Sequence, residues 1–269
     1  MITNRTQLNA VIGYPLGHSQ SPLLHNALYK KLNIDAVLVA LPHKDIKRLA
    51  EVIKTANIGL TVVTMPFKQS IRPFLDEIDE RAKAIGAVNT VINKKGKLMG
   101  YNTDIDGIAS ALSGVPLAGK NVLLIGAGGA ARAVAYFLHK KRANIVYLNR
   151  TKSKARKLQK DFSGKTVNLN AVDPAQMDVI INATSVGMES NALPIPKSFL
   201  RKEQYVFDVV YNVNSTELLR QAKKRGAKTI SGMEMFIGQG LRQVELYTGK
   251  ALNTNKMKKY AHQIIKQSQ

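Results

Sequence analysis

Residues 121–131 read NVLLIGAGGAA, and an apolar segment rich in alanine follows them to about Leu138. This order predicts a strand, a glycine-rich turn and a helix. Gly126 permits the tight turn, Gly128 lets the backbone approach a pyrophosphate, and Ala131 allows the helix to pack closely on the strand. The helix N-terminus adds unpaired amides and a partial positive charge. The sequence therefore predicts a dinucleotide site, with a purely structural turn as the alternative. The predicted contacts are Gly126, Ala127, Gly128, Gly129 and Ala130.

The residues after the next expected strand indicate which dinucleotide is bound. Enzymes that use NAD place Asp or Glu about 20 residues beyond the glycine turn, where it accepts a hydrogen bond from the ribose. This chain has Asn149-Arg150-Thr151 there, and no acidic residue lies between Lys140 and Lys160. A guanidinium and a hydroxyl can bind a 2′-phosphate that a carboxylate would repel. We therefore expect NADP(H), although most lysines of this segment can equally be a solvated helix face. The predicted contacts are Asn149, Arg150, Thr151, Lys152 and Lys154.

Short apolar runs alternate with amphipathic stretches along the whole chain, which predicts an α/β fold. Before residue 103 we expect strands at 10–13, 36–41 and 58–65, helices at 22–32, 44–55 and 76–84, and a hairpin of 88–92 with 97–101. A helix is expected from Asp104 to about Leu112. Further strands are expected at 121–125, 145–149, 167–169, 179–182, 206–210 and 229–230, and final helices at 233–247 and 255–266. We expect the final helices to pack on the first domain, with a ligand cleft between two domains.

Composition narrows the class of protein. The 269 residues include no cysteine, which excludes disulfides, thiolate catalysis and Cys-ligated zinc. No apolar run approaches the ~18 residues of a membrane span, and the N-terminus lacks a signal-peptide pattern, so we expect a cytoplasmic protein. Lys and Arg number 40 against 18 Asp and Glu, a net charge of +22. The charge is spread along the chain and few aromatics accompany it, which favours anionic small ligands over nucleic acid.

Polar residues precede the first expected helix. In His18-Ser19-Gln20-Ser21-Pro22, Ser21 is expected to be the N-cap and Pro22 the first helical residue. The two serine hydroxyls beside unpaired helix amides suit a carboxylate ligand. A capped helix with no ligand is the alternative.

A second polar set follows the strands of the first domain. Pro66 is expected to take the chain out of the sheet and set Lys68 at its mouth, with Asn89 in the hairpin and Asp104 just after it. Oxidising an alcohol by hydride loss requires removal of the hydroxyl proton, which a lysine oriented by a carboxylate can accept. These residues predict a polyol site. Taken singly, Lys68 can be a surface lysine and Asp104 a helix cap.

Together, these motifs resemble the shikimate dehydrogenase family. They occur in the family's order and cover nearly the whole chain. The segments that carry the resemblance are GYP at 13–15, HSQSP at 18–22, VTMPFK at 63–68, GAVNT at 86–90, GYNTD at 100–104, GAGGA at 126–130, NRT at 149–151, NATSVGM at 182–188 and GMEM at 232–235 with Gln239.

The resemblance implies two α/β domains. Residues 1–103, completed by helices in 237–269, would form a mixed-sheet substrate domain, and 104–236 a Rossmann-type NADP-binding domain. The activity implied is the NADPH-dependent, reversible reduction of 3-dehydroshikimate to shikimate in aromatic amino acid biosynthesis, without a metal. A monomer or a homodimer would fit.

The resemblance also implies residue roles. Lys68 would be the acid and base, paired with Asp104. Ser19 and Ser21 would hold the substrate carboxylate, and Tyr211 would close over the substrate. The ring would be bound by Thr64, Asn89, Asp104 and Gln239. Val209 and Gly232 would lie near the nicotinamide, and Glu80 near the cofactor.

The chain departs from the family pattern at two places. Val62 stands where the family often has Asn, so one substrate contact is either missing or supplied by Thr61. Val213 and Glu217 stand where prolines are common, which affects the shape of that loop. Two alternatives to shikimate dehydrogenase remain open: a quinate/shikimate dehydrogenase paralogue, and a non-enzymatic NADP-sensing or nucleic-acid-binding protein on the same scaffold.

Overall fold

The computed structural model describes residues 2–211 and 215–268. The chain divides into two compact units, Met1–Asp106 with Ile237–Gln269 and Gly107–Phe236. The two divisions fall inside helices α4 (Asp104–Ala111) and α8 (Gly232–Thr248), so each helix contributes residues to both units. Val213 lies outside the described residues, whereas Glu217 is the first residue of a helix in the second unit.

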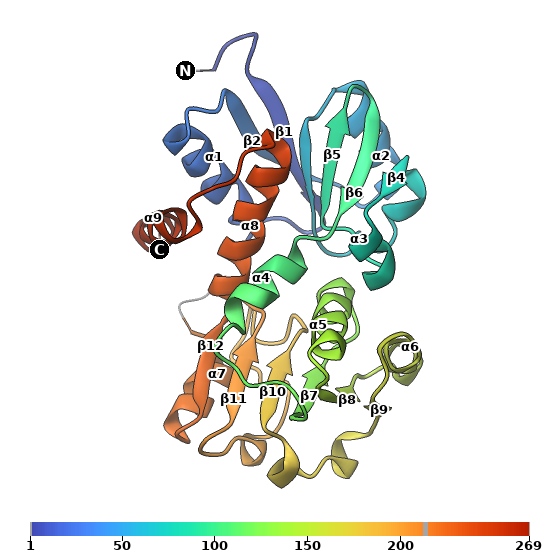
Figure 1. Cartoon of the computed structure of the whole chain (residues 1–269), viewed down its shortest axis with the longest axis vertical. Helices are drawn as coiled ribbons and strands as arrows, with labels where there is room; N and C mark the ends of the chain where they lie inside the picture. Colours follow the sequence, from blue (N-terminus) through green and yellow to red (C-terminus); the bar gives the residue numbers. More distant parts are fainter. Residues whose placement is uncertain (1, 212–214, 269) are drawn as a thin grey trace. The chain divides into compact units, whose positions relative to one another are not determined.

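Unit 1, Met1–Asp106 with Ile237–Gln269, is built on a mixed six-stranded sheet (Figure 1). Its strands are β1 (Gln7–Gly13), β2 (Ala36–Pro42), β3 (Leu60–Val63), β4 (Glu77–Ile78), β5 (Thr90–Lys94) and β6 (Lys97–Tyr101), in the order β2-β1-β3-β5-β6-β4. Its other helices are α1 (Ser21–Lys31), α2 (Ile46–Thr55), α3 (Glu80–Ile85) and α9 (Thr254–Gln267), with a 3₁₀ turn at Arg72–Phe74. β3 pairs antiparallel to β5, whereas β1 is parallel to β2 and β3. The mixed sheet expected for this part of the chain is present.

The two faces of this sheet differ in chemistry because successive strand residues point to opposite sides. Ala10 and Ile12 of β1 belong to an apolar cluster that includes Leu49 and Ile53 of α2. The neighbouring Asn9 is fully buried and donates to the Tyr29 hydroxyl of α1, at 2.9 Å. The face toward α1 therefore contains buried hydrogen-bonding groups, while the face toward α2 is an apolar core.

Unit 2, Gly107–Phe236, is built on a six-stranded, fully parallel sheet. Its strands are β7 (Asn121–Ile125), β8 (Asn144–Leu148), β9 (Lys165–Thr166), β10 (Val179–Asn182), β11 (Tyr205–Asp208) and β12 (Lys228–Ser231), in the order β12-β11-β10-β7-β8-β9 (Figure 1). The helices between them are α5 (Gly129–Lys140), α6 (Lys152–Phe162) and α7 (Glu217–Lys224), with 3₁₀ turns at Leu169–Ala171, Pro174–Gln176 and Lys197–Phe199. The strand order reverses between β7 and β10, and ligands of such sheets bind beyond the carboxyl ends of the strands at that point.

Three local expectations were wrong, each because of contacts at a sheet edge or turn. The helix expected at 76–84 begins only at Glu80, since Asp79 caps it and Asp76 instead exchanges hydrogen bonds with Leu98 of β6. The strand expected at 167–169 is the two-residue β9, after which a 3₁₀ turn forms. The hairpin turn is shorter than expected because Lys95 and Gly96, both at positive φ, close a two-residue loop.

Candidate active site

The loop after β3 brings Lys68 to Asp104, at the start of α4. Lys68 Nζ donates to Asp104 Oδ2 at 2.6 Å, and the two side chains are 18% and 4% exposed. Hydrogen bonds between ions in a partly buried place are stronger and better oriented than those in water. The sequence-predicted pair is therefore a formed contact, with the lysine as its more accessible member.

Asn89 completes the bonding of the Asp104 carboxylate. Its Nδ2 donates to Asp104 Oδ1 at 2.9 Å, and its Oδ1 accepts from the backbone N–H of Thr103 at 2.7 Å. Because a backbone N–H can only donate, this second contact fixes which end of the Asn89 amide faces the carboxylate. Gln239 Oε1 lies 3.4 Å from the same Nδ2. Four of the predicted residues, Lys68, Asn89, Asp104 and Gln239, therefore form one hydrogen-bonded cluster.

The predicted serines lie at the start of α1, but the cap differs from expectation. Ser21 is the buried first residue of the helix, and the N-cap is Gln20, which makes no side-chain cap bond. The expected capping role of Ser21 is wrong because the helix begins one residue earlier. The Ser21 N–H donates to Ser19 Oγ at 3.4 Å, so the two serines remain adjacent.

Thr64 follows β3 and lies against the end of β1. A Cβ added at Gly13 would come within 2.5 Å of Thr64 Cγ2 and 2.8 Å of the Met65 carbonyl oxygen. The Tyr14 N–H also donates to that carbonyl, at 3.0 Å. Gly13 is therefore required for the close approach of these two strand ends.

Thr61 does not replace the polar side chain that the family often has at the position of Val62. Thr61 pairs with Ala10 and Val91 and shares their face of the sheet, whereas Val62 pairs with Thr90 on the opposite face. The expectation that Thr61 supplies the missing contact is therefore wrong.

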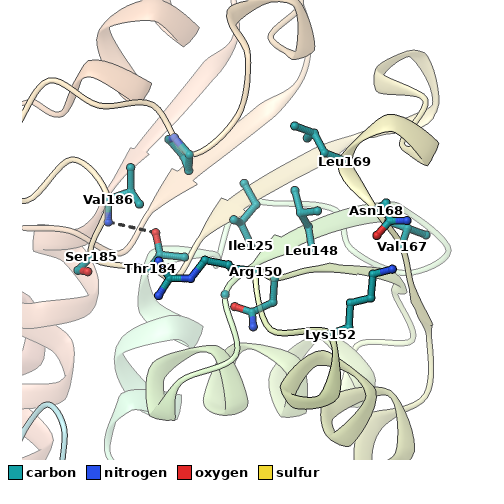
Figure 2. Close-up of a pocket in the computed structure, with 13 residues that line it drawn as sticks. Ile125, Leu148, Arg150, Lys152, Val167, Asn168, Leu169, Thr184, Ser185 and Val186 are labelled. Atoms are coloured by element: carbon teal, nitrogen blue, oxygen red, sulfur yellow. Dashed lines mark hydrogen bonds between the residues drawn. The ribbon is translucent and has the colours of Figure 1, made fainter.

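A cavity of about 590 Å³ opens beside the carboxyl ends of β7, β8 and β10 in unit 2 (Figure 2). This volume lies within the range of small-molecule sites, roughly 300–1,000 Å³. Gly126 lines the cavity with φ +110°, and a Cβ there would lie 2.8 Å from the Ala183 carbonyl oxygen. Both the backbone angle and the close approach therefore require glycine at the end of β7. The described lining residues are Ile125, Gly126, Leu148, Asn149, Arg150, Lys152, Val167, Asn168, Leu169, Thr184, Ser185, Val186 and Pro194.

The cavity contains four of the residues predicted to bind the dinucleotide, namely Gly126, Asn149, Arg150 and Lys152. Among its described lining residues none is Asp or Glu, so Arg150 and Lys152 give this wall a positive charge (Figure 2). The other predicted cofactor residues lie outside the described lining. Ala127 and Gly128 form the turn before α5, and Gly129 and Ala130 are the first two residues of that helix. Thr151 is the N-cap of α6, and Lys154 is exposed on α6.

Other lining residues had no role assigned from the sequence. Thr184, Ser185 and Val186 follow β10, and the Thr184 hydroxyl donates to Asn182 Oδ1 at 2.7 Å. The same hydroxyl accepts from the Val186 N–H at 3.1 Å (Figure 2). Their place after the strand next to β7 is the signal that could have identified them. Asn168 and its two neighbours could not be identified in this way, because they were expected to be a strand.

The remaining predicted residues occupy three places. A Cβ added to Gly232 would lie 2.4 Å from the Val209 carbonyl oxygen, so these two backbones are in close contact in unit 2. The Tyr211 ring stacks on Phe236, with centroids 4.2 Å apart and planes at 10°. Glu80 is the exposed first residue of α3 in unit 1.

Comparisons with known proteins match three consecutive parts of the chain. Residues 11–91 match the shikimate dehydrogenase substrate binding domain, 108–191 the shikimate/quinate 5-dehydrogenase family, and 232–259 the shikimate 5′-dehydrogenase C-terminal domain. The shikimate dehydrogenase (NADP(+)) of Pyrococcus abyssi is 45% identical over 242 residues, 89% of this chain and 91% of that protein. The chain belongs to the shikimate dehydrogenase family. The resemblance stated from its motifs is thereby confirmed.

Solved shikimate dehydrogenase structures have the same fold. One in complex with NADP+ is 39% identical, with a TM-score of 0.90 over 99% of this chain and 97% of that one. Shikimate 5-dehydrogenase from Thermus thermophilus, in complex with NADP(H) and shikimate, is 34% identical, with a TM-score of 0.85. The match covers 96% of this chain and 99% of that one. The expected α/β fold of two domains is confirmed. Within residues 2–211 and 215–268, none of the helices has the length and apolar content needed to cross a membrane.

Among the buried titratable groups of this shikimate dehydrogenase family member, His25 and Asp208 lie outside the Lys68–Asp104 cluster. Burial lowers the pKa of His25 to about 4, so the ring is neutral near pH 7. Burial raises the pKa of Asp208 to about 6, although the carboxylate accepts bonds from Thr216 and Asn182 at 2.7 and 2.9 Å. Asp208 thereby joins the end of β10 to the start of α7.

Proposed function

We propose that this chain catalyses the NADPH-dependent, reversible reduction of 3-dehydroshikimate to shikimate. The observation that carries the proposal is the 2.6 Å contact between Lys68 and the buried Asp104, in a chain of the shikimate dehydrogenase family. A non-enzymatic sensor would require neither residue. The names of the relatives and structures described above likewise favour the dehydrogenase over the two alternatives.

Lys68 carries the proton transfer in this proposal. In shikimate oxidation, the neutral amine accepts the proton of the substrate hydroxyl as the hydride leaves the same carbon; in reduction, the ammonium returns that proton to the carbonyl oxygen. The carbon gains or loses two electrons, and bound NADP(H) supplies or accepts the hydride. Asp104 orients the amine, and Asn89 holds the second oxygen of Asp104.

We assign substrate binding to unit 1. Ser19 and Ser21 would hold the carboxylate beside the start of α1, and Thr64, Asn89 and Gln239 would bind ring hydroxyls. Tyr211 would cover the substrate. The buried position of Ser21 and the hydrogen-bonded cluster around Asn89 support these roles.

The residues of unit 2 fit NADP(H). The backbone at Gly126 leaves no room for a side chain beside Ala183, as a pyrophosphate-binding turn requires. Arg150 and Lys152 on the cavity wall have the charge and donors to bind a 2′-phosphate, with Asn149, Thr151 and Lys154 around them. Val209 and Gly232 would lie by the nicotinamide, and Glu80 near the cofactor.

The test is the initial rate of nicotinamide reduction, with shikimate or quinate crossed against NADP+ or NAD+. We expect the highest kcat/KM with shikimate and NADP+. A higher value with quinate and NAD+ would assign the chain to the paralogue. Binding of NADPH without turnover of any pair would support a sensor, and salt-sensitive binding of DNA or RNA would indicate the nucleic-acid alternative.

A further inference from the structure

Two glutamines of α8 contact the start of β5 and Asn89, the residue that precedes this strand. Gln239 and Gln243 are four residues apart and therefore share one face of the helix. Gln239 Oε1 lies 3.4 Å from Asn89 Nδ2, and Gln243 Nε2 lies 3.5 Å from the Asn89 carbonyl oxygen. Gln243 also donates to the Thr90 hydroxyl at 3.0 Å. The proposed function assigns a role to Gln239 but none to Gln243 or Thr90.

The Thr90 hydroxyl transmits the contact to Asn89. It accepts from Gln243, and its single hydrogen points toward Asn89 Oδ1 at 2.8 Å. Because Oδ1 already accepts from the Thr103 N–H, the Asn89 amide has one orientation, with Nδ2 toward Asp104. The hydrogen bonds therefore run in one direction, from Gln243 through Thr90 and Asn89 to Asp104.

Every member of this array is buried. The exposed fractions are 0% for Gln243 and Thr90, 1% for Asn89 and 3% for Asp104. Away from water, each hydrogen bond strongly restricts the orientation of the side chains that it joins. If one of these bonds is removed, no water is present to bond to the polar group that remains. A change at Gln243 is therefore expected to alter the position of Asn89.

Gln243 also lies beside the buried ring of His25. Its Oε1 is buried without a hydrogen-bond partner among the described residues, and so is Nε2 of His25, the ring whose pKa a Gln243 side-chain contact affects. His25 Nδ1 faces the Ser21 carbonyl oxygen, at 3.0 Å, and must be the donor there. The neutral ring then offers Gln243 only a lone pair.

We propose that Gln243 and Thr90 are positioning residues of the active site, which hold the Asn89 amide so that it keeps the Asp104 carboxylate directed toward Lys68. The inference rests on the proposed dehydrogenase function. Neither residue needs to touch the substrate, because each acts through Asn89.

The test uses three variants of the array: Thr90→Val, Gln243→Met and the double variant that combines these two substitutions. Thr61→Val is the control with which they are compared. Valine and methionine approximate the volume of the replaced side chains but remove the hydrogen-bonding groups. Thr61→Val is a matched control, because Thr61 is also fully buried in the central sheet and its hydroxyl has no hydrogen-bond partner among the described residues. The measurements are kcat and KM for shikimate and NADP+, with thermal unfolding to verify the fold.

We expect each single variant to lose about tenfold in kcat/KM for shikimate, with a raised KM for shikimate and an unchanged KM for NADP+. The double variant should lose about as much as one single variant, since both act through Asn89. Thr61→Val should behave as the wild type. Three results would overturn the proposal. In the first, the losses of kcat/KM in the two single variants multiply in the double variant, and in the second, Thr61→Val loses as much kcat/KM as they do. In the third, only kcat falls, in proportion to the fraction of folded protein.

A second readout separates failure of this inference from failure of the proposed function. The side-chain amide hydrogens of Asn89, assigned as the NMR signals lost in Asn89→Ser, should exchange slowly with solvent in the wild type and in Thr61→Val. They should exchange faster in Thr90→Val and Gln243→Met. If the wild type does not oxidise shikimate, the proposed function is wrong while the exchange rates still test the array. Equal exchange in all variants would refute the positioning role whatever the activity.

Discussion

Replacing Lys68 by methionine is the sharpest test of the proposed chemistry. The substitution approximately keeps the length of the side chain but removes the amine that donates to Asp104 Oδ2 at 2.6 Å. General acid–base catalysis contributes roughly 10²–10⁴-fold, so the middle of that range corresponds to about 4 kcal/mol of barrier. We expect kcat for shikimate oxidation to fall by about a thousandfold.

The structure also limits the loss of stability in Lys68→Met. Removing one partner of a fully buried ion pair costs about 3–5 kcal/mol, because the other charge is left unpaired. Here the lysine side chain is 18% exposed and Asn89 still donates to Asp104, so we expect about 2 kcal/mol. NADPH binding, which we assign to the other unit, should change less than twofold.

The assay is the initial rate at saturating shikimate and NADP+, followed by absorbance of the reduced nicotinamide, with urea unfolding of the same preparations. Lys54→Met is the matched control, because Lys54 and Asp76 form a lysine–aspartate pair at 3.4 Å that is 47% and 38% exposed. Exposed pairs contribute little, so this variant should retain both rate and stability. A folded Lys68→Met protein with kcat within tenfold of the wild type would refute the acid–base role.

Three further outcomes are expected. Arg150→Ala should weaken NADPH binding about tenfold and NADH binding by less than twofold, as measured by nicotinamide fluorescence; equal losses would mean that another group contacts the 2′-phosphate. Gly126→Ala should weaken cofactor binding and lower the free energy of unfolding by about 2 kcal/mol, since its φ is +110° and the new Cβ would lie 2.8 Å from the Ala183 oxygen; a wild-type affinity would contradict this. His25 is neutral when folded, with a pKa of about 4, whereas the unfolded chain takes up its proton below about pH 6.5. Stability from His25 is therefore present above pH 6.5 and lost as pH falls toward 4, by up to about 3 kcal/mol. Urea unfolding of His25→Gln should show less of this loss, while His139→Gln, at an exposed position, should retain it.

The fold class follows from local patterns in the sequence. The strand β7 was predicted with its observed bounds, Asn121–Ile125, because an aliphatic run that ends at a glycine turn has few alternatives. The helix expected at 76–84 was wrong for the opposite reason. Asp76 bonds to Leu98, 22 residues away, and no local pattern reports such a contact.

The sequence by itself determined the chemistry available to this protein: a glycine turn that requires a backbone without side chains, a basic segment instead of an acidic residue, and a lysine and an aspartate after expected strands. These are properties of residue type and of spacing along the chain, which local sterics and charge make readable. Only the tertiary structure decided which side chains meet. The contact from Gln243 to Thr90 joins residues 153 apart in sequence, and the opposite faces of Thr61 and Val62 depend on strand register. Such contacts arise from packing between segments that are distant in sequence. Because these groups are buried, a polar group that lost its partner there could not bond to water instead.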